Sequence, residues 1–396
     1  MILTKEYLSR FLEKSKRDKN LYLYELNIEK INEDAFDDFI FLETLNIRGN
    51  QIRKIENLDR LINLSYLNVS YNSISKIEGL DNLISLENLE IDNNQIEKIE
   101  GLEKLTKLTD LYICCNQIEK LEGLDALTKL ERLFIFNNRI KKLEGLDKLT
   151  KLKELDIRLN QIEKLERLDK ITNLEDLVIA GNCIKKIEGL NELTKLRRLD
   201  ISSNQFEKIE GLDKLTNLEE LRLFRNRISK VEGLDTLINL RELLISHNHI
   251  SKMEGLDKLI NLEELNISHN QILEIEIPDK LTKFRILDIT RNPLVQEEID
   301  KVANTFPYIK FYHSRPLRKR VINLVDSLSH NLKIDEDEKC LICLEKKEQL
   351  YIPNHCCKII ICEECYMNYN FKDECIYGCK EKEKAFENGF YLIPKT

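Results

Sequence analysis

Apolar residues recur along most of the chain in one repeating order. Leucine and isoleucine alternate with other residues over a short stretch, as in Leu89-Glu-Ile91, and then return every third position, as at Ile96, Ile99 and Leu102. Alternation at a spacing of two predicts a short, half-buried β-strand. A spacing of three predicts a 3₁₀-like or irregular segment on the opposite side. Each repeat is therefore expected to contain one strand, one turn and one return segment.

An asparagine marks the turn that follows each predicted strand. Its side chain carries both a donor and an acceptor, so it can satisfy backbone groups that are buried at the turn. We interpret these asparagines as a structural ladder rather than a binding site. They recur every 22 residues, at Asn50, Asn72, Asn94, Asn116, Asn138, Asn160, Asn182, Asn204, Asn226, Asn248, Asn270 and Asn292.

A glycine precedes the return segment in most repeats, for example Gly79, Gly123 and Gly255. Arg167 and Ile277 occupy the same position in other repeats. Because residues other than glycine occur at this position, we expect that the turn does not require a positive φ there. These glycines are interpreted as structural and not as a phosphate-binding pattern.

The frame L-x-x-L-x-I-x-x-N-x-I resembles the leucine-rich repeat family, whose repeats have a period in this range. The resemblance implies an α/β repeat solenoid, a horseshoe with a parallel concave sheet and a 3₁₀ or irregular convex side. The Asn-Gln-Ile-Glu-Lys-Ile-Glu-Gly-Leu frame and the terminal Asn292-Pro293 are similar to the subfamily of the regulatory subunit of type 1 serine/threonine protein phosphatase. That likeness spans roughly residues 20–313 and implies the phosphatase catalytic subunit as one partner.

Five segments are expected along the chain, because a stack of repeats needs covers at both ends. Residues 1–41 are predicted to form an N-terminal cap, with one amphipathic helix over 4–17 and a degenerate repeat. Residues 42–291 hold twelve repeats, and 292–313 form a C-terminal cap with a helix from Glu297 to Phe306. A linker helix with an acidic boundary over 314–338 precedes a zinc-binding domain over 339–396.

The residues that alternate with the core positions of the strands are assigned to the concave face. An apolar and aromatic patch results from Tyr112, Cys114, Phe134, Phe136 and Val178. Acidic Glu90 and Asp92 flank it on one side, and basic Arg222 and Arg225 on the other. Aromatic anchors inside a charged rim are typical of protein-binding hot spots. The residues predicted to contact a partner protein are Glu90, Tyr112, Phe134, Phe136, Asp156, Val178, Arg222 and Phe224.

Composition narrows the class of protein. The 396 residues are 42% hydrophobic and 33% charged, with a net charge of −8, which disfavours nucleic acid as the main partner. The start of the chain has no apolar signal region, and 18 apolar residues never occur in a row. An intracellular protein, cytoplasmic or nuclear and without a membrane anchor, is therefore expected. P-loop, His-Glu-x-x-His and dinucleotide-binding glycine patterns are absent from the sequence, so a conventional enzyme is disfavoured.

Eight of the 11 cysteines are concentrated near the C-terminal end of the chain. In a reducing compartment such a cluster indicates metal ligands before disulfides. Cys-x₂-Cys pairs hold tetrahedral zinc, and four pairs predict two zinc ions. The predicted ligands are Cys340, Cys343, Cys356, Cys357, Cys362, Cys365, Cys375 and Cys379. His355 is an alternative to Cys356, because adjacent cysteines would strain one site.

The order of these pairs resembles the RING family, especially its all-cysteine members. The resemblance implies interleaved sites, with Cys340, Cys343, Cys362 and Cys365 on one zinc and the other four cysteines on the second. It also implies contacts with a ubiquitin-conjugating enzyme through Ile342, Tyr369 and Lys380. The last pair departs from the family, because three residues separate Cys375 from Cys379 where two are usual.

Two hypotheses of different classes follow. In the first, the chain is a ubiquitin ligase whose solenoid recruits a substrate and whose zinc domain recruits the conjugating enzyme. In the second, it is a non-enzymatic regulatory or scaffolding subunit, for example of a type 1 phosphatase, and the zinc module is structural.

Overall fold

The computed structural model describes residues 1–314, 350–353, 361–362 and 390–393. The chain divides into two compact units. The first contains Met1–Asn226 and Gly233–Glu242, and the second contains Arg227–Glu232 and Leu243–Thr396. The boundary between them falls inside the repeat array, where the repeat pattern itself gives no sign of a division.

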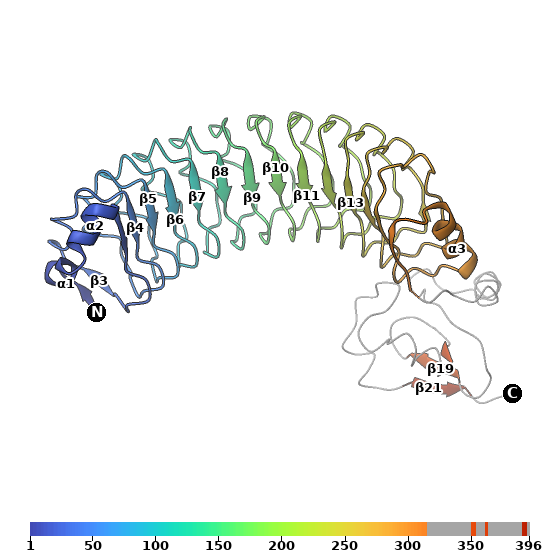
Figure 1. Cartoon of the computed structure of the whole chain (residues 1–396), viewed down its shortest axis with the longest axis horizontal. Helices are drawn as coiled ribbons and strands as arrows, with labels where there is room; N and C mark the ends of the chain where they lie inside the picture. The colour runs from blue at the N-terminus through green and yellow to red at the C-terminus, as the bar shows by residue number, and fades with distance from the viewer. Residues whose placement is uncertain (315–349, 354–360, 363–389, 394–396) are drawn as a thin grey trace. The chain divides into compact units, whose positions relative to one another are not determined.

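In the first unit each repeat supplies one three-residue strand to a parallel sheet (Figure 1). Neighbouring strands pair without offset, so that Leu111 lies between Leu89 and Leu133. Equivalent positions of successive repeats therefore form straight rows across the sheet. In sheet order the strands are β2 (Asn20–Tyr22), β4 (Thr44–Asn46), β5 (Tyr66–Asn68), β6 (Asn88–Glu90), β7 (Asp110–Tyr112), β8 (Arg132–Phe134), β9 (Glu154–Asp156), β10 (Asp176–Val178), β11 (Arg198–Asp200) and β12 (Glu220–Arg222). This arrangement confirms the predicted solenoid of parallel strands.

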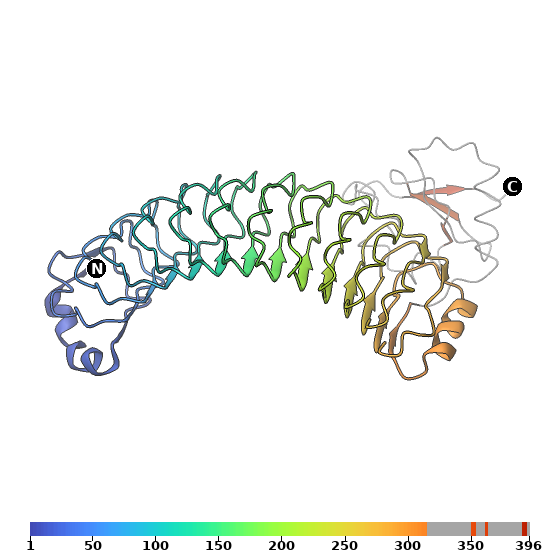
Figure 2. The same ribbon diagram turned by 90° about the horizontal axis from the view of Figure 1, so that it is seen from above.

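The core of this unit lies between the sheet and the return segments (Figure 2). The side chains of Leu102, Leu105 and Leu108 are fully buried. Leu105 N donates to Leu102 O and Leu108 N donates to Leu105 O, both at 3.0 Å. These bonds are of the 3₁₀ type, but in the described repeats they close separate turns and do not extend into a helix. The convex side is therefore irregular.

The N-terminal end of the chain forms two short helices, α1 (Lys5–Ser9) and α2 (Leu12–Asp18), where one continuous helix was predicted. Thr4 caps α1, since its hydroxyl oxygen accepts from Tyr7 N at 3.2 Å. Phe11 N donates to Leu8 O, three residues back, so the helical ladder is interrupted at this point. Strand β1 (Ile2–Leu3) pairs with β3 (Lys30–Ile31) beside these helices.

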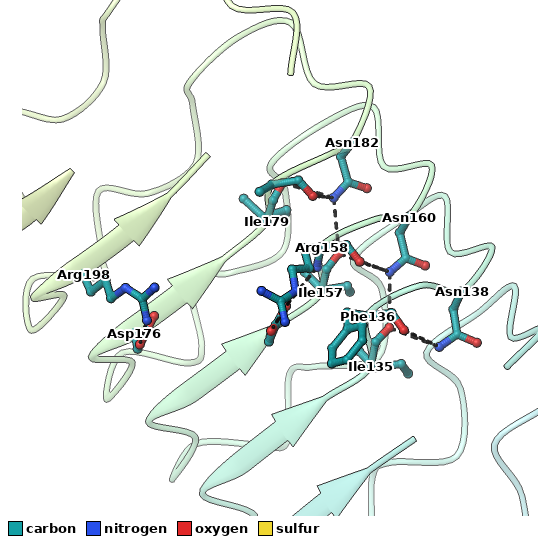
Figure 3. A network of polar contacts seen from close by, with 12 residues as sticks. Ile135, Phe136, Asn138, Ile157, Arg158, Asn160, Asp176, Ile179, Asn182 and Arg198 are labelled. Atoms are coloured by element: carbon teal, nitrogen blue, oxygen red, sulfur yellow. Dashed lines mark hydrogen bonds and ion pairs between the residues drawn. The ribbon is translucent and has the colours of Figure 1, made fainter. Parts of the chain in front are cut away.

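The asparagine ladder is present and is nearly identical from repeat to repeat (Figure 3). Asn160 is 8% exposed, and its Oδ1 accepts from Ile140 N at 3.0 Å. Its Nδ2 lies 3.2 Å from Ile135 O in the preceding repeat and 3.1 Å from Ile157 O in its own. One side chain thus satisfies an amide of one repeat and carbonyls of two, which confirms the structural interpretation of these asparagines.

The expectation that the turn position needs no positive φ is wrong for the repeats that carry glycine, and it holds at Ile277, which has no positive φ. The φ of Gly123 is +90°, and a Cβ placed there would lie 2.1 Å from Ile99 O of the preceding repeat. Arg167, at the equivalent position of a later repeat, also has a positive φ of 62°. The arginine therefore tolerates a left-handed conformation at a cost, and its presence does not mean that the turn has relaxed.

The second unit continues the same repeat pattern and ends in a helical cap. Its strands β13 (Glu242–Leu244), β15 (Glu264–Asn266), β17 (Ile286–Asp288) and β18 (Lys310–Tyr312) follow one another in the sheet, and β14 (Lys252–Met253) pairs with β16 (Glu274–Ile275). Helix α3 (Gln296–Thr305) covers the predicted segment before Pro307 and buries Ile299 and Val302. None of the helices in the described residues is long and apolar enough to cross a membrane.

Near the C-terminus the structure describes three strands of one small antiparallel sheet. They are β19 (Leu350–Pro353), β20 (Ile361–Cys362) and β21 (Phe390–Ile393), in the order β20-β19-β21. Of the predicted linker helix over 314–338, all residues after 314 lie outside the described part of the chain.

We predict that Asn160→Ala lowers the free energy of unfolding by about 2–4 kcal/mol, because it leaves buried backbone groups without partners. Asn160→Asp keeps an acceptor for Ile140 N but places a carboxylate against two carbonyl oxygens. That variant should therefore be closer to the wild type at pH 4, where a protonated carboxyl can donate, than at pH 7. Thermal unfolding measures both effects.

The matched control for this prediction is Asn173→Ala. Asn173 makes two exposed hydrogen bonds, donating to Thr150 O at 2.7 Å and accepting from Lys195 Nζ at 2.6 Å, so their loss should cost less than about 1 kcal/mol. Equal destabilisation by Asn160→Ala and Asn173→Ala would contradict the ladder's importance.

A second prediction concerns the turn conformation. Gly123→Ala should destabilise the chain by about 2 kcal/mol or more, since the added Cβ meets a backbone oxygen. Arg167→Gly should instead raise stability by roughly 0.5–1 kcal/mol, as relief of left-handed strain exceeds the entropy gained by the unfolded chain. The midpoints of thermal unfolding test both, and a lower midpoint for Arg167→Gly would refute the strain argument.

Candidate functional site

Three rows of side chains point away from the core on the strands of the first unit, and we call them together the concave face. They are formed by the first residue of each strand, the third residue, and the residue two positions beyond the strand. The alternation of residues in the sequence predicted the second and third rows but not the first. The missing signal was the same alternation continued one step toward the N-terminus. On β5 to β12 that row contains Tyr66, Asn88, Asp110, Arg132, Glu154, Asp176, Arg198 and Glu220.

An aromatic pair lies at the middle of the second row. The rings of Tyr112 and Phe134 are parallel within 1°, with centroids 4.8 Å apart. The in-register pairing of β7 with β8 places these two residues opposite one another and imposes the stack. Both side chains are half-buried, so part of each ring remains open to solvent. Burial, and then the charge of Asp110, raises the pKa of the Tyr112 phenol.

Phe136 extends this patch into the third row. The guanidinium of Arg158 lies over its ring, 4.7 Å from the centroid. Arg158 also contacts Asp156, with Nε 3.4 Å from Oδ2. The arginine is therefore held between an aromatic ring and a carboxylate (Figure 3). We call Tyr112, Phe134 and Phe136 the aromatic patch.

Two predicted members of the patch contribute almost no surface. Cys114 is 2% exposed and Val178 is 7% exposed. The backbone N of Cys114 donates to Asp92 Oδ1 at 2.6 Å. Burial, and then the charge of Asp92, raises the pKa of the Cys114 thiol, so this group is an unreactive core thiol.

The acidic side of the patch is already engaged by neighbouring side chains. Glu90 accepts from the Tyr66 hydroxyl at 2.7 Å and from the Asn68 amide. Burial, followed by this bond, raises the pKa of Tyr66 to about 12. Glu90 is thus held in place by residues of β5, and Tyr66 is a neighbour that the sequence pattern did not identify.

The basic side differs from the expectation. Arg222 contacts Glu220 and lies 3.6 Å from Glu242, so it does not present an unpaired positive charge. Arg198 lies 3.1 Å from Asp176 (Figure 3) and 3.3 Å from Glu220. Arg222 of the predicted basic flank is therefore compensated by carboxylates. Arg225, the other residue of that flank, is exposed and has no ion pair among the described residues.

Phe224 also lies away from the aromatic patch. It follows β12, whereas Phe136 follows β8, and three strands separate the two residues in the sheet. Phe224 is half-buried in its own row. The sheet therefore does not bring it together with the other predicted contact residues.

Acidic groups outnumber basic groups on the concave face from β6 to β12. Burial raises the pKa of Asp92, Asp156 and Asp176, which shows that nearby cations do not fully compensate these carboxylates. Oδ1 of Asp176 is buried and has no hydrogen-bond partner among the described residues. Eight acidic side chains face four arginines there, namely Glu90, Asp92, Asp110, Glu154, Asp156, Asp176, Asp200 and Glu220 against Arg132, Arg158, Arg198 and Arg222.

The predicted zinc site cannot be followed in the same way. Cys362 lies at the end of β20, and within the described ranges no group of three or more His, Cys, Asp or Glu side chains could hold a metal ion. The remaining predicted residues lie outside the described part of the chain: Cys340, Cys343, Cys356, Cys357, Cys365, Cys375, Cys379, the alternative ligand His355, and the predicted enzyme contacts Ile342, Tyr369 and Lys380.

Comparison with protein families gives two matches. Residues 20–209 match the family described as leucine-rich repeat region. Residues 216–258 and 260–304 match the one described as leucine rich repeats, two copies. Among curated protein sequences, none matches this chain.

Solved structures resemble the repeats. An internalin from Listeria monocytogenes is 28% identical, with a TM-score of 0.64 over 69% of this chain and 81% of that one. YopM from Yersinia enterocolitica is 26% identical, with a TM-score of 0.53 over 68% of this chain and 53% of that one. The leucine-rich repeat domain of APL1B is 23% identical, covers 81% of this chain and 96% of its own, and has a TM-score of 0.68, which shows a shared fold alone.

Proposed function

Since this chain belongs to the leucine-rich repeat proteins, we propose that it is an interaction scaffold that binds a partner protein on the concave face of its first unit. The observation that carries the proposal is the Tyr112–Phe134 stack. Two large rings are held parallel by strand pairing, so little conformational entropy remains to be lost when a partner covers them. Aromatic side chains fixed in this way are typical anchors of protein interfaces.

The surroundings of the stack support the same function. Glu90 on one side is held by Tyr66 and Asn68, and Arg158 on the other is held by Phe136 and Asp156. A partner would therefore meet a preformed surface, with the aromatic patch at its centre and polar groups around it. Such an arrangement matches the anatomy of interfaces with an apolar core and a polar rim.

The proposal predicts where a partner touches the chain. A photo-crosslinking p-benzoylphenylalanine introduced at Phe134 should give a discrete protein adduct in cells that express the full chain. The same probe at Ile84, which is 55% exposed and not part of the concave face, should not give that adduct. Equal adducts from both positions would place binding elsewhere.

Once the adduct is identified, its purified component provides the quantitative test. Tyr112→Ala combined with Phe134→Ala should weaken its binding by about 2 kcal/mol or more. Phe224→Ala, which removes an aromatic ring from a distant strand of the same face, is the matched control and should have little effect. An unchanged affinity of the double variant would refute the anchor role of the stack.

For the C-terminal segment we propose two zinc ions and a role in ubiquitin transfer. The support is the spacing of the eight cysteines, whose thiolates are suited to tetrahedral zinc. Strands β19 and β20 pair antiparallel, and Cys356 and Cys357 lie in the segment that joins them. A module of this kind would hold a charged conjugating enzyme beside a substrate bound by the solenoid, and catalysis would come from proximity and orientation.

This proposal predicts a separation between zinc content and ligase activity. The purified protein should contain two zinc ions and should form ubiquitin chains with at least one enzyme of a panel of conjugating enzymes. Cys340→Ala should lose zinc and chain formation together. Ile342→Ala should lose chain formation and keep both zinc ions, as measured by metal analysis.

The alternative is a non-enzymatic subunit with a structural zinc module, for example a regulator of a type 1 phosphatase. This alternative is favoured if the purified protein contains two zinc ions but forms no ubiquitin chains with any conjugating enzyme of the panel. The alternative also requires capture of the purified phosphatase catalytic subunit. That capture should be lost in the Tyr112→Ala and Phe134→Ala double variant and retained when residues 339–396 are deleted.

A further inference from the structure

The row that contains the aromatic stack has a carboxylate at each end. Its order across β6 to β9 is Glu90, Tyr112, Phe134 and Asp156, with the strands paired in register. Neighbouring strands are about 4.8 Å apart, so each ring has a carboxylate-bearing residue on the side that faces away from its stacking partner. The face of an aromatic ring is negative, and cations bind to it within about 6 Å of the centroid.

The molecule already contains a cation bound in this way. The Arg158 guanidinium lies 4.7 Å from the centroid of Phe136 and 3.4 Å from the carboxylate of Asp156. It shows that a ring and a carboxylate on this sheet are spaced to hold an arginine between them. In the adjacent row the rings of Tyr112 and Phe134 also have carboxylates beside them, but no described cation lies over either ring.

The charges of the concave face act in the same direction. Each of its four arginines from β6 to β12 contacts a carboxylate of the same sheet, and acidic groups remain in excess. Glu154 is the first residue of β9, the strand that carries Asp156. Its side chain has no ion pair or hydrogen bond among the described residues. The face therefore attracts positive charge and repels acidic proteins and nucleic acid.

A purely apolar partner segment fits this face less well than a basic one. Cys114 and Val178 are buried, so three rings provide most of the apolar surface near the stack. We propose that the partner presents a basic segment to this face and places a lysine or arginine side chain against the Tyr112–Phe134 stack, next to the carboxylate of Glu90. Asp156 is 7% exposed and paired with Arg158, so it contributes negative charge to the site and no direct contact. This inference rests on the proposed function, that a partner protein binds the concave face, and specifies the chemistry of the bound segment.

Three labelled peptides of about twelve residues test the inference on the full chain. They share the same apolar residues and differ only in their charged positions, which carry Lys and Arg, Gln, or Glu. Fluorescence anisotropy at physiological salt measures their affinities. The basic peptide should bind at least about tenfold more tightly than the neutral one, and the acidic peptide should bind most weakly.

Variants of the chain separate specific docking from general attraction. Tyr112→Ala with Phe134→Ala should weaken binding of the basic peptide about tenfold. Glu154→Lys, which removes no side-chain hydrogen bond or ion pair of the described residues, should also weaken it about tenfold. Glu163→Lys changes the net charge equally, but Glu163 is exposed outside the concave face, and this control should change the affinity less than twofold. Thermal unfolding checks that every variant is folded.

Each remaining outcome counts against the inference in a distinct way. Equal effects of Glu154→Lys and Glu163→Lys would mean unspecific charge attraction and would overturn it. A neutral peptide that binds as tightly as the basic one, and still depends on Tyr112 and Phe134, would overturn the inference and leave the proposed function standing. If none of the peptides binds, or if the affinity of every peptide is unchanged by the Tyr112→Ala and Phe134→Ala substitutions, the inference is overturned. Whether a partner protein binds at the stack is decided separately, by the crosslinked adduct from position 134.

Discussion

The asparagine ladder is the interaction on which the rest of the first unit depends. Every repeat turns sharply after its strand, and the turn buries backbone groups that have no partner within a helix or sheet. A single amide, as in Asn160, accepts from Ile140 N of the preceding repeat and donates to carbonyls of two repeats. Because the bonds link neighbouring repeats, each turn is stable only when the next repeat is stacked against it. The ladder therefore couples local backbone satisfaction to the growth of the solenoid.

Strict stacking has a direct consequence for the surface. With strands paired without offset, side chains at equivalent positions lie in rows, and residues 22 positions apart in the chain become neighbours. This is why the rings of Tyr112 and Phe134 stack. For the same reason Arg198 and Asp176 form an ion pair. Neighbouring side chains on the concave face thus come from different repeats, and substitution of one residue affects its neighbours on both adjacent strands.

The positive charges on this face are largely paired with carboxylates of the same sheet. Arg222 and Arg198 contact carboxylates of the sheet, so Arg222 does not provide the free positive charge that the alternation of residues predicted, and Arg225 alone of that flank stays exposed. What remains is an acidic excess around three aromatic rings. The same register that creates the stack therefore also selects which charges are left for a partner.

The sequence by itself determined the solenoid, the strand of each of the twelve repeats and the role of the asparagines, because a 22-residue period repeated twelve times leaves one way to bury the leucines and isoleucines. It also located Tyr112 and Phe134 on one row, since alternation assigns faces without knowledge of neighbours. The stack geometry, the burial of Cys114 and Val178 and the pairing of Arg222 required the tertiary structure. Those properties depend on the sizes and charges of side chains brought together from different repeats, which no single repeat specifies. The positive φ at Gly123 and Arg167 likewise follows from the closeness of the preceding turn and not from the residue type.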